Sequence, residues 1–148
     1  MTLRNNLMSN RYCRFFVHVV CICVLMQTTN LIIAGDIGGS NTTIAWMAPK
    51  DSGRFQIIYA KRYSSHELRG IEEALDDAQA EFLRKHPNAT AKACCLCGAG
   101  PIRNNCCRLT NLPWDLDGEQ IAQRYRLPVY VINDFSAICS GIPLLRND

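Results

Sequence analysis

One segment in the middle of the chain carries apolar residues with the period of an α-helix. Between residues 71 and 86 the apolar positions recur at spacings of three and four, acidic residues fill the gaps, and His86-Pro87 ends the pattern. Short apolar runs typical of strands stand on both sides of this segment, at residues 31–35, 42–47, 55–62, 92–97 and 129–132. A helix with one apolar face needs a second layer to cover that face. The sequence therefore predicts an α/β domain in which helices flank a mixed sheet.

Weaker signals complete the order of the elements. Residues 106–109 are expected to pair as a further short strand. Asp117-x-x-Gln120 is similar to the capping box that starts a helix. The apolar residues 135–142 follow the last strand and predict a final helix.

Composition and charge narrow the class of protein. The 148 residues are 48% apolar, 20% charged and 8% aromatic, which suits one globular domain and excludes a disordered, collagenous or multi-span membrane protein. The chain has 16 Lys and Arg against 13 Asp and Glu, but Arg4, Arg11 and Arg14 precede residue 31 in a stretch without acidic residues. Residues 31–148 are therefore neutral, and we expect no nucleic acid as a partner.

The first thirty residues differ from the rest. Residues 15–26 read FFVHVVCICVLM, which has the shape of a signal-peptide core but is not followed by a cleavage site of small residues. Export is disfavoured because Asn41-Thr42-Thr43, a glycosylation acceptor pattern, falls in the best functional loop. We expect residues 1–30 to be an extension, with Met26 as the true start, and residues 31–148 to be the folded domain. Membrane association through residues 15–26 is the alternative.

The nine cysteines indicate a reducing, cytoplasmic setting. Their number is odd, and neighbours such as Cys94 and Cys95 make poor disulfide frameworks. The spacing Cys94-x-x-Cys97 also occurs in zinc sites, but alternate side chains of a strand point to opposite faces, so Cys95 and Cys97 point away from Cys94. We expect these cysteines to be small buried apolar residues rather than metal ligands.

A glycine-bearing turn follows the first predicted strand. Two adjacent glycines allow backbone N–H groups to approach an anion closely, while a hydroxyl suits phosphate oxygens and a carboxylate suits the water shell of Mg²⁺. The alternative is a hairpin turn whose residues serve only its geometry. The pattern is neither a Walker loop nor a dinucleotide-binding fingerprint. The residues concerned are Gly35, Asp36, Ile37, Gly38, Gly39 and Ser40.

Two more segments carry polar residues beside predicted strands. Asn133 and Asp134 stand at the carboxyl end of the most apolar strand, where open α/β sheets bind ligands, so a carboxylate there can act as a general base toward a hydroxyl. The alternative is that Asp134 only caps the helix that follows. Residues 109–114, LTNLPW, suit either the wall of a sugar pocket or a packed surface loop with a buried Trp.

Four motifs in this order resemble the bacterial-type glucokinase family of sugar kinases: LIIAGDIGGSNTTIAW, GAGPI, LTNLPWDL and VYVINDFSAICSGIP. The resemblance runs from about residue 31 to the end of the chain. It implies the N-terminal domain of the actin-like ATPase (ribonuclease H-like) fold. It also implies a cytoplasmic enzyme that transfers the γ-phosphate of ATP to the 6-hydroxyl of glucose with the help of Mg²⁺, and a homodimer as the full-length protein.

The resemblance also assigns roles to matching residues. The family's residues in the turn from Gly35 to Ser40 hold ATP phosphates, and Ser40 stands where the family more often has Thr. Asp36 is expected to place Mg²⁺ through water. Asn133 is expected to hydrogen-bond the sugar hydroxyls, and Asp134 to be the general base that takes the proton from the glucose 6-hydroxyl.

Kinases of this family have a second domain, and this chain ends before that domain begins. Because the substrate cleft lies between the two domains, we expect these residues to hold roughly half of a site and to be inactive alone. A competing interpretation from another class is a non-catalytic, sugar-sensing regulator of the same superfamily. Such regulators carry a DNA-binding helix-turn-helix ahead of the first strand, and the apolar residues 15–26 do not form one.

Overall fold

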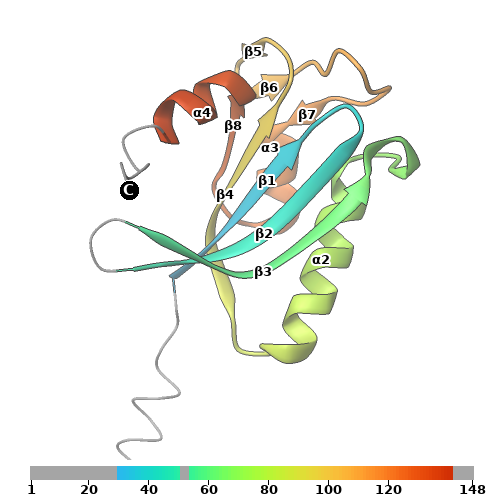
Figure 1. Ribbon diagram of the computed structural model, residues 1–148. Helices are drawn as coiled ribbons and strands as arrows, with labels where there is room; N and C mark the ends of the chain where they lie inside the picture. Colours follow the sequence, from blue (N-terminus) through green and yellow to red (C-terminus); the bar gives the residue numbers. More distant parts are fainter. Residues whose placement is uncertain (1–29, 51–53, 142–148) are drawn as a thin grey trace, which may run out of the picture.

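A five-stranded mixed sheet forms the centre of the protein (Figure 1). The computed structural model describes residues 30–50 and 54–141. The strand order is β3-β2-β1-β4-β8. The strands are β1 (Asn30–Ile37), β2 (Asn41–Pro49), β3 (Phe55–Ser64), β4 (Thr90–Gly98) and β8 (Val129–Asn133). The first three are antiparallel neighbours, and β4 and β8 continue the sheet parallel to β1, so the predicted mixed sheet is confirmed.

Two helices cover one face of this sheet. α2 (Ile71–Lys85) and α3 (Gly118–Tyr125) bury their apolar sides against the same face of the sheet, α2 over β2 and β3 and α3 over β8. α2 ends at the residue before His86, as the sequence pattern predicts. α3 begins at its predicted capping signal, because the Asp117 carboxylate accepts hydrogen bonds from the N–H groups of Glu119 and Gln120, both at 3.0 Å. The last helix, α4 (Asp134–Gly141), directly follows β8.

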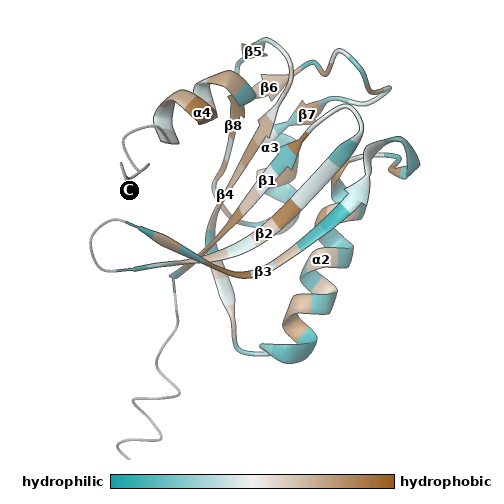
Figure 2. Ribbon diagram, viewed as in Figure 1, coloured by the Kyte–Doolittle hydropathy of each residue, from teal (hydrophilic) through white to brown (hydrophobic). Residues whose placement is uncertain are grey.

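The core lies between these two helices and the sheet. Along β1 the side chains of Leu31, Ile33 and Ile37 point into it and are buried. The Trp46 ring of β2 stacks on the Phe82 ring of α2, with 4.3 Å between the ring centroids. Figure 2 shows the pattern behind this packing, since the turns of α2 alternate between hydrophilic and hydrophobic residues.

The opposite face of the sheet, here called the second face, carries a different apolar surface. Ile32, Met47 and Ile57 are neighbours across β1, β2 and β3 on this face, and Ile57 is 61% exposed. On α4, at the β8 end of the sheet, Phe135 and Ile138 are exposed as well. The described structure therefore presents apolar side chains to solvent along the sheet and on α4.

The chain between β4 and α3 differs from the prediction of one strand at residues 106–109. It forms a small antiparallel sheet of β5 (Ile102–Arg103), β6 (Cys106–Cys107) and β7 (Leu116–Asp117). β6 is only two residues long because the chain turns away after it, where the Leu109 N–H donates to the Asp115 carboxylate at 3.1 Å. A short 3-10 turn, η1 (Ser65–Glu67), joins β3 to the segment before α2.

The cysteines of β4 divide between the two faces, as predicted. Cys94 is buried in the core, whereas Cys95 and Cys97 are half-buried on the second face. Burial raises the pKa of the Cys94 thiol to about 12, so this thiol stays protonated at neutral pH. Within residues 30–50 and 54–141, no three His, Cys, Asp or Glu side chains gather in a way that could hold a metal ion.

Some expectations fall on residues outside those described. They concern Met26 as the start, the apolar run at residues 15–26, and the end of the chain at residues 142–148. Among the helices of the described ranges, none has the length and apolar content needed to cross a membrane.

Candidate active site

The two main candidate segments lie at the ends of strands in the same part of the sheet. The strand register places Ile37 of β1 beside Gly98 of β4, and Gly98 beside Asn133 of β8. These three strands are parallel, so the glycine turn after β1 and Asp134 after β8 lie at the same edge of the sheet. Two inter-strand spacings, roughly 10 Å, separate them.

Buried hydroxyl groups hold the glycine turn from behind. The Gly38 N–H donates to the Asn41 carbonyl at 2.9 Å, which closes the turn between β1 and β2. Ser65 Oγ donates to the Gly38 carbonyl at 2.7 Å and lies 2.9 Å from Thr42 Oγ1. The Ser65 N–H donates to the Ser40 carbonyl at 3.0 Å. Because Ser65 and Thr42 have no exposed surface, these bonds hold the turn in one conformation without competition from water.

Asp36 is exposed on the second face, just before the turn. Its neighbour across the parallel strands is Cys97, whose thiol donates to Asp36 Oδ1 at 3.5 Å. Burial, and after it the charge of Asp36, raises the pKa of the Cys97 thiol to about 12, so the sulfur keeps the proton that this bond needs. An exposed carboxylate held in this way suits the water shell of a divalent cation, since Mg²⁺ keeps several waters and needs few protein ligands.

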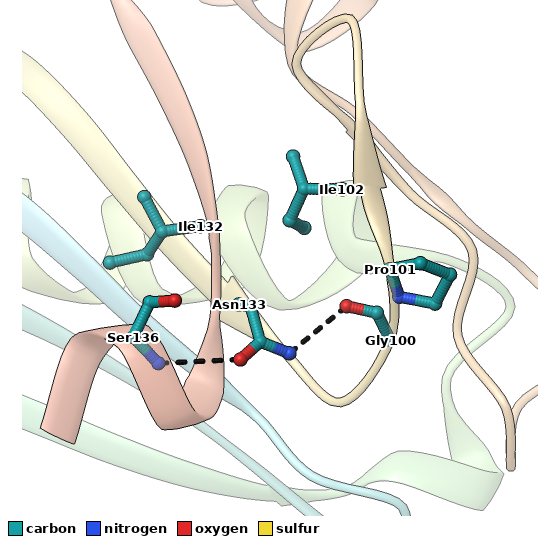
Figure 3. A pocket seen from close by; sticks show the side chains of 6 residues that line it. All are labelled: Gly100, Pro101, Ile102, Ile132, Asn133 and Ser136. Atoms are coloured by element: carbon teal, nitrogen blue, oxygen red, sulfur yellow. Dashed lines mark hydrogen bonds between the residues drawn. The ribbon is translucent and has the colours of Figure 1, made fainter. Parts of the chain in front are cut away.

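Asn133 links the loop after β4 to the start of α4 (Figure 3). Its Nδ2 donates to the Gly100 carbonyl at 3.0 Å, and its Oδ1 accepts the N–H groups of Phe135 at 3.0 Å and Ser136 at 3.3 Å. Asn133 thus caps α4, while Asp134 Oδ1 accepts the Phe135 N–H at 2.8 Å. The Asn133 amide retains a second N–H, and Asp134 a second carboxylate oxygen, for a ligand.

An open pocket of about 460 Å³ lies beside Asn133. Gly100 and Pro101 line it from the loop after β4, and Ile132 and Ser136 line it from the β8–α4 junction (Figure 3). Asp134 adjoins this pocket in the chain without lining it. Position 100 has no room for a side chain, because a Cβ there would collide with the Arg108 carbonyl oxygen.

The loop at residues 109–114 packs against the glycine turn and does not line this pocket. Gly39 and Asn111 face one another across a narrow crevice. The half-buried Trp114 fixes the far end of the loop, since its Nε1 donates to the Leu68 carbonyl at 3.1 Å. The motif thus forms a packed loop with a half-buried Trp, and a role as the wall of a sugar pocket stays a prediction.

Three residues that shape the site are not predicted by the sequence patterns. Thr42 could have been found from the sequence, because it stands at a core-facing position of a predicted strand, where a hydroxyl needs a buried hydrogen-bond partner. Ser65 and Cys97 carry no local signal, since they contact residues 27 and 61 positions away in the chain. Only the folded sheet brings these side chains to the turn.

The strand order and the two segments at one sheet edge define a class of protein, the actin-like ATPase fold of sugar kinases. The model of the glucokinase family matches residues 33–148. This chain therefore belongs to the glucokinase family.

Individual relatives agree with this assignment. A glucokinase from Nostoc punctiforme is 36% identical over 117 residues, which is 78% of this chain and 33% of that protein. A glucokinase from Synechocystis is 37% identical over 117 residues, which is 74% of this chain and 33% of that protein. The crystal structure of a glucokinase from an Antarctic psychrotroph matches with a TM-score of 0.67 and 30% identity, over 80% of this chain and 36% of that one. The chain spans about a third of the length of the curated relatives it matches.

Proposed function

We propose that this chain is the N-terminal part of a glucokinase that transfers the γ-phosphate of ATP to the 6-hydroxyl of glucose. Residues 31–148 form the small N-terminal domain of that enzyme in this proposal. The observation that carries it is the register of the three parallel strands, in which Ile37, Gly98 and Asn133 are neighbours. This register brings the glycine turn and Asp134 to one edge of the sheet. Membership of the glucokinase family supports ATP and glucose as the two substrates.

The glycine turn is the proposed phosphate site. Backbone N–H groups of the turn and the Ser40 hydroxyl bind the phosphate oxygens of ATP, and Asp36 binds Mg²⁺ through water. Two observations support this assignment: Ser65 holds the turn in one conformation, and the Cys97 thiol holds one oxygen of Asp36. A metal bound there would offset the charge of the phosphates. The residues of the proposed site are Gly35, Asp36, Ile37, Gly38, Gly39 and Ser40.

Asn133 and Asp134 are the proposed sugar-binding and catalytic residues. The free N–H of Asn133 donates to a sugar hydroxyl, and the Asp134 carboxylate accepts the proton of the 6-hydroxyl. The 6-oxygen then bonds to the γ-phosphorus as the bond from that phosphorus to the bridging oxygen breaks, which leaves ADP. Phosphoryl transfer depends mainly on positioning, and the fixed cap that Asn133 forms on α4 supports a fixed place for Asp134.

A chimeric enzyme tests this function directly. Residues 33–148 replace the matching third of the Nostoc punctiforme glucokinase, and we expect glucose-dependent formation of ADP. Asp134→Asn should lower kcat about 10²- to 10⁴-fold, because the general base is lost. Glu119→Gln, at an exposed carboxylate on α3, is the matched control and should leave kcat unchanged. An Asp134→Asn chimera with full activity would remove Asp134 from the mechanism.

The 148-residue chain by itself is expected to show no glucose-dependent turnover of ATP. The competing interpretation of a sugar-sensing regulator is not favoured, because the family model and the relatives reported above are glucokinases. A cytoplasmic location is proposed, and the six free thiols of the described residues support it. The proposed homodimer concerns the full-length enzyme, whose mass in solution tests it.

A further inference from the structure

The loop at residues 109–112 lies beside the glycine turn and is anchored to the segment after β4, and the proposed function gives it no role. Thr110 bonds the Ala99 carbonyl twice, through its N–H at 3.4 Å and through its hydroxyl at 3.3 Å. Leu109 is buried, and its N–H donates to the Asp115 carboxylate. The residue that follows these anchors, Asn111, is therefore presented at a defined position.

Asn111 lies directly over the second glycine of the turn. A Cβ built on Gly39 would stand 3.1 Å from the Asn111 Cβ and 3.4 Å from Asn111 Nδ2. Asn111 is exposed, and none of the hydrogen bonds that anchor the loop involves its side-chain amide. The amide nitrogen therefore lies beside Gly39, and its N–H groups are available.

The chemistry of this position favours an anion. A side-chain amide offers two N–H donors, and hydrogen bonds to a charged acceptor are stronger than those to a neutral one. Residues 35–42 contain no Lys or Arg, and Asp36 adds a negative charge at the same edge of the sheet. A polyphosphate bound at this turn therefore depends on neutral donors and on its cation, and each additional donor contributes to its affinity.

We propose that Asn111 is a phosphate-binding residue, which donates a side-chain N–H to an oxygen of the polyphosphate chain bound over Gly38 and Gly39. The phosphate site is then built from two loops, residues 35–40 and residues 109–112. This inference rests on the proposed function and names a further binding residue for it. The ligand chemistry is a chain of phosphates, carried either by ATP or by inorganic polyphosphate.

Nuclear magnetic resonance of the ¹⁵N-labelled 148-residue chain tests the proposal without any need for turnover. Mg²⁺-ATP and Mg²⁺-tripolyphosphate are titrated in parallel, so that binding through the phosphates is separated from binding that needs the nucleoside. The signals followed are the backbone amides of Gly38 and Gly39 and the side-chain NH₂ of Asn111. Both groups of signals should shift with the same dissociation constant.

Two variants separate a donor from a residue that only fills space. Asn111→Asp keeps the size of the side chain but loses both donors, and Asn111→Leu loses them without adding charge. Each should raise the dissociation constant about 10-fold or more. Asn88→Asp, an exposed Asn at the opposite end of β4, is the control for charge and should bind as the unaltered chain does.

The possible results distinguish a failure of the Asn111 proposal from a failure of the proposed function. If Gly38 and Gly39 respond but both Asn111 variants bind within twofold of the unaltered chain, Asn111 is not a phosphate ligand and the proposed function stands. If the glycine amides of the folded, unaltered chain do not respond to either ligand, the phosphate site itself is wrong and the inference falls with it. Weaker binding in Asn111→Leu but not in Asn111→Asp also overturns the donor role.

Discussion

At the scale of single residues, Ser65 holds the glycine turn from the core through two hydrogen bonds to its carbonyl groups. It is fully buried, binds the Gly38 carbonyl through its hydroxyl and the Ser40 carbonyl through its N–H, and contacts Thr42. A buried hydroxyl is tolerated because it is satisfied, and it leaves its partners unsatisfied when it is removed. The conformation of the glycine turn is thus determined from the interior of the domain.

Ser65→Ala should lower the free energy of unfolding by about 1–3 kcal/mol, because the Gly38 carbonyl and the Thr42 hydroxyl lose a buried partner. Urea denaturation followed by circular dichroism measures the change. Ser64→Ala is the matched control, since the side chain of this neighbouring serine makes no capping hydrogen bond, and it should cost less than about 0.5 kcal/mol. Equal losses in the two variants would contradict the role of Ser65.

At the scale of elements, an ion-pair cluster ties α2 to β3. Lys61 Nζ of β3 lies 2.7 Å from Asp77 and 2.8 Å from Glu81, one turn apart on α2. The hydrogen bonds from Lys61 hold the pKa values of both carboxyls below their usual range. The unfolded chain therefore takes up protons at a higher pH than the folded chain, so the stabilisation is present at neutral pH and is lost as the pH falls.

Lys61→Met should make the stability of the protein less sensitive to acid. From about pH 5 to about pH 3 the unaltered chain should lose more of its free energy of unfolding than the variant, because Lys61 is the largest cause of the lowered pKa values of Asp77 and Glu81 and the variant lacks it. Urea midpoints at several pH values measure this difference. Lys92→Met, on an exposed position of β4, should keep the original pH dependence.

A second connection between elements closes the free edge of β8. Asn105, in the turn between β5 and β6, donates from Nδ2 to the Val129 carbonyl at 2.9 Å and accepts the Val131 N–H on Oδ1 at 2.8 Å. One side chain thus replaces part of a neighbouring strand. Asn105 also has a positive φ of 60°, which asparagine tolerates better than most residues.

Asn105→Ala should therefore destabilise the protein by about 2 kcal/mol more than Asn104→Ala does. Asn104 also has a positive φ, of 51°, so the control carries the backbone cost without the two hydrogen bonds to β8. Urea denaturation of both variants gives the difference, and hydrogen exchange at the Val131 amide shows whether the strand edge has opened. Equal destabilisation would assign the whole effect to the backbone.

Sequence patterns were informative for elements whose signal is periodic and local. The helix at α2 spans several turns of regular spacing, and the strand at β8 is continuously apolar, so both were predicted close to their observed bounds. The two-residue strands β5, β6 and β7 are too short to show a period, and tertiary contacts such as the one at Asn105 define them. In the candidate site, the sequence indicates the glycine turn, Asn133 and Asp134. It does not indicate that Ser65 and Cys97 bind to the turn and to Asp36.

At the scale of the whole molecule, the two faces of the sheet differ in kind. One face is buried under α2 and α3, whereas the second face exposes Ile57 and α4 exposes Phe135 and Ile138. Side chains of this type on a protein surface promote association with other apolar surfaces. The exposed side chains contribute little to the folding of the described residues.

Ile57→Lys should lower the binding of the dye ANS and the tendency of the chain to aggregate. Its free energy of unfolding should change by less than about 0.5 kcal/mol, because the side chain is exposed. ANS fluorescence, light scattering and urea denaturation measure the three quantities. Ile44→Lys is the comparison, since Ile44 is completely buried and its replacement should unfold the chain. Strong destabilisation by Ile57→Lys would show that something covers this position in solution.

β4 lies between the glycine turn and Asp134, and its width sets the distance between these two segments. The gap between the two segments equals a whole number of strand widths, so it cannot be widened gradually by changes in β4 itself. Room for a ligand of another size beside Asn133 therefore depends on the loop at residues 99–101, which lines that pocket and can change in length or tilt while the spacing of the strands beneath it stays the same.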